Sequence, residues 1–272
     1  MCDFKLYSPC CNWYLEIHTD CSNVAELVVN LFGGFIISQK VEKENLAVLE
    51  VTILKCDFGY IMSGKGREYK IKEINGVGFY LYAVIDKLIE GNMNERFCVL
   101  HGGVIAKDNQ AYCVIAPTMT GKSTFITYFS LNGYDYLADD YIFVDREKNT
   151  ITPLPLPVSL RDTTVLGDLL NGYYAVSGHN ELRGEQNTLV SLYKDSKIAY
   201  SLDKILFIQR GAGNTLRLLN KGELYKTLLF NMKNALALDR ECIAVGNFID
   251  NVCGYWLSYN DFEYVAKCIN SI

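Results

Sequence analysis

The feature that most constrains the fold is residues 116–124, which read Ala-Pro-Thr-Met-Thr-Gly-Lys-Ser-Thr. An apolar run at residues 111–115 precedes this segment and is typical of a buried strand, and residues 125–129 continue it as a helix. A strand, a loop and a helix in this order, with Gly-Lys-Ser where the helix begins, bring backbone N–H groups and a helix N-terminus to face a phosphate. The segment therefore predicts a phosphate-binding loop.

Within this loop, Lys122 is expected to reach the outer phosphates of a nucleotide, and the Ser123 hydroxyl to hold Mg²⁺. Ala116 stands where the usual motif has a glycine, so an ordinary strand-to-helix turn with a solvated lysine is the alternative. The residues expected to contact the nucleotide are Ala116, Pro117, Thr118, Met119, Thr120, Gly121, Lys122, Ser123 and Thr124.

Composition narrows the class of protein. The chain has 272 residues, half of them hydrophobic, and a net charge of −5, which does not favour nucleic acid or an acidic membrane surface as a partner. No apolar run is long enough to span a membrane, and the N-terminus does not resemble a signal peptide, so we expect a cytoplasmic protein. The 10 cysteines include no Cys-x-x-Cys pair and are expected to be reduced and mostly buried.

The pattern of apolar residues predicts an α/β (α+β) fold with two domains. Residues 1–95 are expected to be a mostly β domain with helices at 22–31 and 79–89, able to bind a substrate or a partner. Residues 96–272 are expected to hold the phosphate loop.

Further elements are expected in the second domain. Strands are predicted at 98–101, 103–106, 111–115 and 204–209, helices at 224–231 and 261–272, and a polar lid at 178–188.

Two other sites carry chemistry. Asp139 and Asp140 follow an apolar strand one helix after the loop, where one carboxylate would hold the metal and the other would accept a proton from an attacking hydroxyl. Successive strand residues point to opposite faces, so both act together only if the strand ends at this point. The alternative is a pair of turn residues. His101 precedes Gly102 and Gly103 at a strand end, and its alternative is a purely structural role.

Taken in order, His101-Gly102-Gly103, the loop at 116–124 and Leu137-Ala138-Asp139-Asp140 resemble the HPr kinase/phosphorylase superfamily. The likeness continues through Ser159-Leu160-Arg161, residues 205–211 and residues 255–261, and so covers about residues 98–272. These later segments are similar to HPr-kinase-like enzymes of peptide-modification clusters, including lasso-peptide kinases.

The resemblance implies a phosphoenolpyruvate-carboxykinase-like P-loop fold and transfer of the γ-phosphoryl group of ATP to a serine of a peptide or protein. It implies that Lys122 and the loop bind phosphate, that Ser123 and Asp140 hold Mg²⁺, that Asp139 is the base and that His101 supports it. Arg161 would add a positive charge near the phosphates. The Glu-Ile-Arg-Gly-Leu-Gly type signature is not visible, so phosphorolysis is not expected.

Two other functions stay open. Ala116 and Met119 replace residues that are commonly glycine in this loop, which would suit a module that binds ATP as a switch without transferring phosphate. A small-molecule kinase, for example of an amino acid, fits the same residues. The acceptor, the choice between ATP and GTP, and assembly into a homo-oligomer are not fixed by the sequence.

Overall fold

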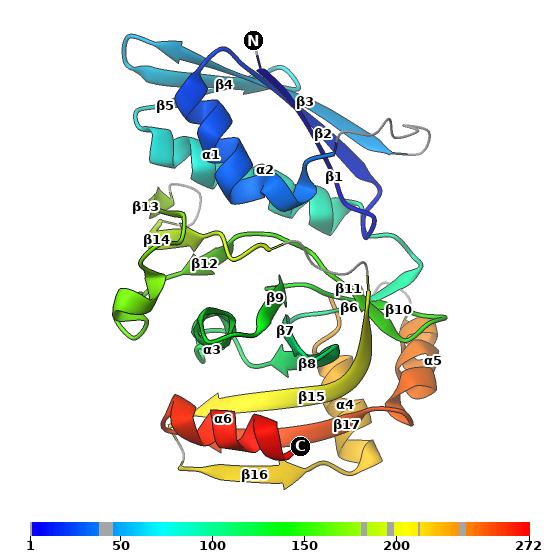
Figure 1. The fold of residues 1–272 in the computed structure, drawn as a ribbon. Helices are drawn as coiled ribbons and strands as arrows, with labels where there is room; N and C mark the ends of the chain where they lie inside the picture. The colour runs from blue at the N-terminus through cyan, green and yellow to red at the C-terminus, as the bar shows by residue number, and fades with distance from the viewer. Residues whose placement is uncertain (1, 38–45, 181–183, 195–198, 212, 234–237) are drawn as a thin grey trace. The chain divides into compact units, whose positions relative to one another are not determined.

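The computed structural model describes residues 2–37, 46–180, 184–194, 199–211, 213–233 and 238–272. The chain is a mixed α/β protein, with three sheets among these residues, and divides into two compact units (Figure 1). Unit 1 comprises Met1–Asn94 and Pro155–Asp195, and unit 2 comprises Glu95–Leu154 and Ser196–Ile272. The second domain expected at 96–272 is not a single unit, because the structure groups Pro155–Asp195 with the N-terminal residues.

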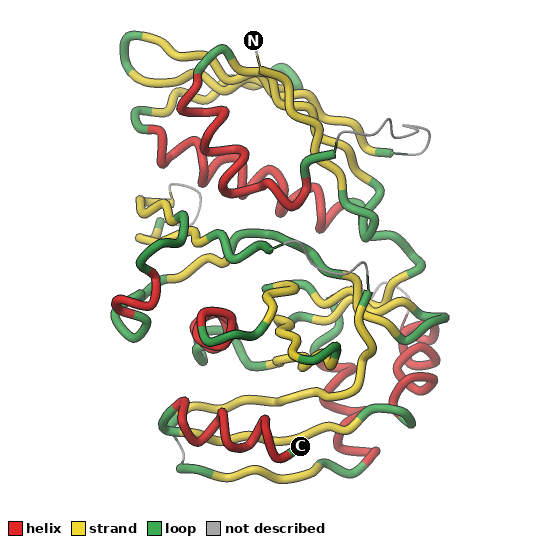
Figure 2. Tube along the Cα trace, viewed as in Figure 1, coloured by secondary structure: helices red, strands yellow, loops and turns green. Residues whose placement is uncertain are grey.

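Unit 1 is built on a five-stranded sheet in the order β1-β2-β3-β4-β5. Only the β2–β3 pair is parallel, because helix α1 carries the chain from one to the other. Helices α1 and α2 lie on one face of this sheet (Figure 2). The elements are β1 (Cys2–Tyr7), β2 (Trp13–Thr19), α1 (Ser22–Phe32), the 3-10 helix η1 (Gly33–Phe35), β3 (Ala47–Cys56), β4 (Gly59–Gly64), β5 (Arg67–Ile71) and α2 (Ile74–Gly91).

The apolar spacing read from the sequence explains both helices. Val24, Leu27, Val28 and Leu31 are all buried along one face of α1, so the helix predicted at residues 22–31 is confirmed. The helix predicted at 79–89 is also confirmed, although α2 begins earlier than expected, at Ile74.

The segment Pro155–Asp195 adds a small three-stranded sheet to unit 1, in the order β12-β14-β13. The side-chain amide of Asn75 in α2 donates a hydrogen bond of 2.8 Å to the carbonyl of Ser177, which connects this sheet to α2. In the polar stretch 178–188, expected to be a lid, residues 178–180 and 185–188 are strand and Gly184 is a turn, and residues 181–183 lie outside the description. The elements are β12 (Val158–Leu160), η2 (Gly167–Leu170), β13 (Ala175–Asn180) and β14 (Glu185–Val190).

Unit 2 is built on a nine-stranded sheet in which β15 is the central strand. It pairs in parallel with β8 on one side and with β17 on the other. The strands are β6 (Phe97–Leu100), β7 (Gly103–Lys107), β8 (Gln110–Ile115), β9 (Asp135–Ala138), β10 (Ile142–Asp145), β11 (Thr150–Thr152), β15 (Tyr200–Arg210), β16 (Thr215–Leu218) and β17 (Cys253–Tyr259). The helices are α3 (Lys122–Leu131), α4 (Lys221–Phe230), α5 (Leu238–Ile249) and α6 (Phe262–Ser271).

An aromatic cluster fixes helix α3 within unit 2. The Tyr128 ring stacks on Phe262 of α6 at 4.1 Å between centroids, and Phe125 meets Tyr259 of β17 edge to face at 5.9 Å. Aromatic pairs of this geometry stabilise packing beyond the area they bury. The cluster therefore anchors the helix that follows the predicted phosphate loop.

No helix in the described part of the chain is long and apolar enough to cross a membrane.

Candidate phosphate-binding and catalytic site

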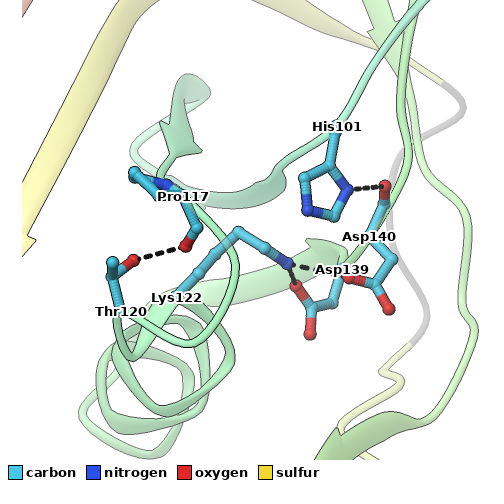
Figure 3. A network of polar contacts seen from close by, with 6 residues as sticks. All are labelled: His101, Pro117, Thr120, Lys122, Asp139 and Asp140. Carbon is cyan, nitrogen blue, oxygen red and sulfur yellow. Dashed lines mark hydrogen bonds and ion pairs between the residues drawn. The ribbon is translucent and has the colours of Figure 1, made fainter. Parts of the chain in front are cut away.

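The predicted loop lies between the end of β8 and the start of α3, as the motif requires. β8 ends at Ile115 and α3 begins at Lys122, with Gly121 as the residue before the helix. Gly121 has φ +92°, a left-handed conformation that a glycine adopts without steric cost. The hydroxyl of Thr120 donates to the carbonyl of Pro117 at 2.6 Å and closes the turn (Figure 3). The structure thus confirms a strand, loop and helix in this order.

The loop also contains a strained residue. Met119 has φ +68°, and the residue is 81% exposed. A left-handed conformation is uncommon for residues other than glycine, asparagine and aspartate, and such strain gathers at functional sites. Ala116, at the other position where glycine is common, is buried and directly follows β8.

Lys122 projects from the first turn of α3 toward both carboxylates. Its ammonium group donates to Oδ1 of Asp139 and, at 3.0 Å, to Oδ1 of Asp140 (Figure 3). Lys122 is 7% exposed and Asp139 is 4% exposed, so this is a buried ion pair. Burial alone would lower the pKa of Lys122, but the two carboxylates together raise it. Lys122 is therefore fully charged at neutral pH.

The two aspartates act on one group because the strand ends before them. β9 ends at Ala138, and Asp140 has φ +68°, so the alternation of strand side chains does not apply. Burial would raise the pKa of Asp140, but the charge of Lys122 and its hydrogen bond hold it below the usual value. The condition set by the sequence for joint action of both carboxylates is met.

His101 lies beside this pair. Its Nδ1 donates to the carbonyl of Asp140 at 3.2 Å, which leaves the lone pair of the neutral ring on Nε2 (Figure 3). Burial, and then the positive charge of Lys122, lower the pKa of His101. The ring is therefore neutral at pH 7.

Gly102 and Gly103 are explained by close packing. A Cβ on Gly102 would lie 2.7 Å from the carbonyl oxygen of Val114, which is backbone of β8, the strand before the predicted loop. A Cβ on Gly103 would lie 2.8 Å from Ile126 of α3. The two glycines let the segment after His101 pass close to the loop strand and helix.

Sequence reasoning missed a second lysine. Lys233 follows α4, in a segment that bridges to β6 through Met232 and Leu100. Its ammonium group lies 3.5 Å from the centroid of the Tyr141 ring. Its positive charge lowers the pKa of both His101 and Asp140, so Lys233 contributes to the electrostatic potential of the site. No local motif surrounds Lys233, so only the tertiary fold reveals it.

The remaining expected site residues fall in two places. Ser123 and Thr124 lie, half-buried, in the first turn of α3 next to Lys122. Arg161 follows β12 and therefore belongs to unit 1, not to the unit that carries the loop. There it pairs with Glu185 at 2.9 Å between Nε and Oε2.

The oxygen donors of the site suit Mg²⁺. Carboxylates and a hydroxyl are hard ligands, and Mg²⁺ is usually held by one or two carboxylates together with substrate phosphates. Within the described residues there is no cluster of three or more His, Cys, Asp and Glu side chains able to cage a metal by themselves. Ser123 and Asp140 therefore fit a Mg²⁺ ion that a nucleotide shares, and not a site made by protein alone.

Comparison with known proteins adds little to this geometry. No protein-family model matches the chain, and no curated protein matches it. Among solved structures the chain is similar to the Hpr(Ser) kinase/phosphatase from Coxiella burnetii, with 11% identity and a TM-score of 0.28. The match covers 60% of this chain and 85% of the other. A TM-score this low does not establish a shared fold, so the site is judged on its own residues.

Proposed function

We propose that the protein is an ATP- and Mg²⁺-dependent kinase that transfers the γ-phosphoryl group to a serine hydroxyl of a peptide or protein. The observation that carries the proposal is the meeting of Lys122, at the helix end of the loop, with the carboxylates of Asp139 and Asp140. Phosphoryl transfer depends mainly on positioning and charge neutralisation, which these groups supply.

In this mechanism the loop N–H groups and Lys122 bind the β- and γ-phosphates. Asp139 accepts the proton of the serine hydroxyl as its oxygen forms a bond to the γ-phosphorus, and the bond from that phosphorus to the bridging oxygen breaks, releasing ADP. Mg²⁺, held by Ser123 and Asp140, would offset the charge of the phosphates. Lys233 adds positive charge near Asp140, and the neutral ring of His101 holds the Asp140 backbone through its hydrogen bond to the carbonyl.

The ion pair between Lys122 and Asp139 gives this mechanism an order. Oδ1 of Asp139 accepts a hydrogen bond from Lys122, so this oxygen is already engaged and is not free to accept one from a serine hydroxyl. Phosphate oxygens that draw the ammonium group away would release the carboxylate. Nucleotide binding therefore precedes activation of the serine.

The proposal extends to the fold of unit 2, the phosphoryl acceptor and the role of unit 1. Unit 2 would be a phosphoenolpyruvate-carboxykinase-like P-loop domain, supported by its loop between β8 and α3 and by the parallel neighbour β15. The acceptor would be a ribosomally made precursor peptide in the cytoplasm. Unit 1 would bind the substrate or a partner.

The test is direct phosphotransfer. The protein would be incubated with Mg²⁺, ATP and the peptides encoded beside its gene, and the products examined by mass spectrometry for an added phosphate. We expect Lys122→Ala and Asp139→Asn each to lower the rate by about 10²- to 10⁴-fold, the usual effect of removing a phosphate-binding charge or a general base. Asp135→Asn, an exposed acid at the start of β9, the strand that precedes Asp139, is the matched control and should transfer normally.

If the wild-type protein phosphorylates none of these peptides, nor free serine and small alcohols, the kinase function is refuted.

A second function is a module that binds nucleotide as a switch without transferring phosphate. It is favoured by the strained Met119 and by the hydrogen bonds of Lys122 with both aspartates. Calorimetry separates the two functions, because ATP binding without transfer supports the switch and no binding at all excludes both.

A further inference from the structure

Unit 1 contains a cavity remote in sequence from the phosphate loop. Its volume is about 570 Å³, within the range of ligand-binding sites in proteins. It lies between strands β3, β4 and β5 of the five-stranded sheet and the C-terminal half of α2. All of its lining residues belong to unit 1, so the cavity is complete within that unit.

The inner surface of the cavity is apolar. Val51 and Met62 line it from the sheet, and Ala83 and Val84 line it from α2. At one side the rings of Tyr69 and Tyr80 meet at 5.2 Å between centroids. A surface of this kind favours aliphatic or aromatic groups.

The charges around the cavity have one sign. Lys65, Arg67 and Lys87 line it and are exposed, and its lining contains no acid. Among described residues, none of these three cations forms an ion pair with a carboxylate. Glu68 is next to Arg67 on β5, but strand alternation directs its side chain to the opposite face. The cavity therefore favours a ligand with a negative charge near its apolar part.

The sheet edge beside the cavity is open. β5 is the last strand of the sheet, and no strand in the described part of the chain pairs with its outer edge. Arg67 and Tyr69 of this edge strand also line the cavity. An extended peptide can add to such an edge through main-chain hydrogen bonds while alternate side chains enter the adjoining pocket. An edge and a pocket together favour a peptide over a small molecule.

We propose that this cavity and the edge of β5 bind an extended peptide segment with apolar side chains at alternate positions and carboxylates at one end. The apolar side chains enter between the sheet and α2, and the carboxylates meet Lys65, Arg67 and Lys87. That this peptide is part of the phosphoryl acceptor rests on the proposed function, whereas the binding site itself does not.

The test is peptide binding to the full-length protein without nucleotide. The probe is a fluorescein-labelled peptide, Val-Thr-Leu-Thr-Val-Glu-Glu-Glu, followed by fluorescence anisotropy. We expect saturable binding with a micromolar dissociation constant. The same peptide ending in three lysines, and one with N-methyl groups on alternate backbone nitrogens, should bind at least 10-fold more weakly.

Variants locate the binding. Arg67→Glu should weaken it at least 10-fold, whereas Lys70→Glu, on the same strand but directed to the other face, should leave it unchanged. Ala83→Trp should fill the cavity and abolish binding. All of these positions are partly or fully exposed, and circular dichroism would verify that each variant is folded.

Three results would overturn the proposal: no binding up to about 1 mM peptide, equal binding of the lysine peptide, or no effect of Arg67→Glu and Ala83→Trp. Binding of decanoate in place of the peptide, with the same loss in both variants, would assign the cavity to a small anionic amphiphile and would also reject the peptide site.

Lys122→Ala should still bind the probe. A failure of phosphotransfer with probe binding intact would therefore reject the kinase and leave the cavity assignment standing.

Discussion

The charge balance of the site is decided by single residues. Lys122 meets two carboxylates, Lys233 lies over the Tyr141 ring, and His101 stays neutral because it is partly buried and close to cations. Two lysines and two aspartates leave the cluster without net charge. An incoming nucleotide thus meets lysines whose charges are already balanced.

Loss of Lys233 should be visible in the titration of His101. In Lys233→Met, one of the charges that lowers the pKa of His101 is removed, so this pKa should rise. The pKa of His101 should stay below the usual value for histidine, because burial and Lys122 act in the same direction. The measurement is an NMR pH titration of the histidine ring protons, with His101→Gln to assign the signal.

The control is Lys226→Met, which removes another lysine from the α4 region. A pKa of His101 that does not change in Lys233→Met, or that changes equally in the control, would show that Lys233 does not act on the site.

The sequence predicted which residues form the candidate site, but it did not predict their backbone conformations. The spacing of Lys122, Asp139 and Asp140 predicted their neighbourhood, because a loop after one strand and acids after another can meet at one edge of a sheet. The left-handed conformations of Met119 and Asp140 were not predictable, since tertiary packing imposes them against local preference. Lys233 was missed because nothing around it in sequence marks it.

Among the elements, the segment between β6 and β7 depends on the absence of a side chain at Gly102. Gly102→Ala would place a methyl group 2.7 Å from the carbonyl oxygen of Val114 and 2.5 Å from Cδ1 of Ile142. Backbone of a central strand cannot move away cheaply, so we expect a loss of about 1–3 kcal/mol in the free energy of unfolding. Urea denaturation measures it.

Gly246→Ala in α5 is the matched control in the same unit. A Cβ there would meet nothing within 4 Å, and alanine in a helix should stabilise the protein by about 0.5–1 kcal/mol. A Gly102→Ala variant as stable as the wild type would mean that the two strands separate more easily than their packing indicates.

Helices and strands were largely predictable because their apolar spacing is regular. α1, α2, α3 and the strands around the phosphate loop lie where the pattern placed them, within a few residues. The assignment of residues 155–195 to unit 1 was not predictable from the sequence. Prolines fixed residues 153–157 as extended chain, but no local signal states that the following strands pack with residues 1–94.

On the scale of the whole molecule, the chain passes from one unit to the other three times, after residues 94, 154 and 195. A fragment of residues 96–272 would therefore contain Pro155–Asp195 of unit 1 without the rest of that unit. A fragment that represents unit 2 alone must leave these residues out. Thr150 and Ile151 of β11 pair with Ser201 and Tyr200 of β15, so a short linker can join the two parts of unit 2.

We expect a chain of residues 95–154 joined by a glycine-rich linker to residues 199–272 to be soluble and to unfold cooperatively in urea. The uncut fragment 96–272 should aggregate, because its part of unit 1 exposes the apolar side chains that unit 1 buries, such as Val176 and Leu189. Size-exclusion chromatography and denaturation compare the two fragments. Equal behaviour would contradict the division into units.

The central position of β15 has a consequence for the order of synthesis. A ribosome makes β8 and the loop that follows it long before residues 200–210, and makes β17 later still. Until then one side of β8 has no strand beside it, and Cys113, Val114 and Ile115 lack part of the cover that the complete protein gives them. A nascent chain that stops before β15 therefore presents an apolar strand edge to its surroundings, and needs rapid elongation or a chaperone to avoid aggregation.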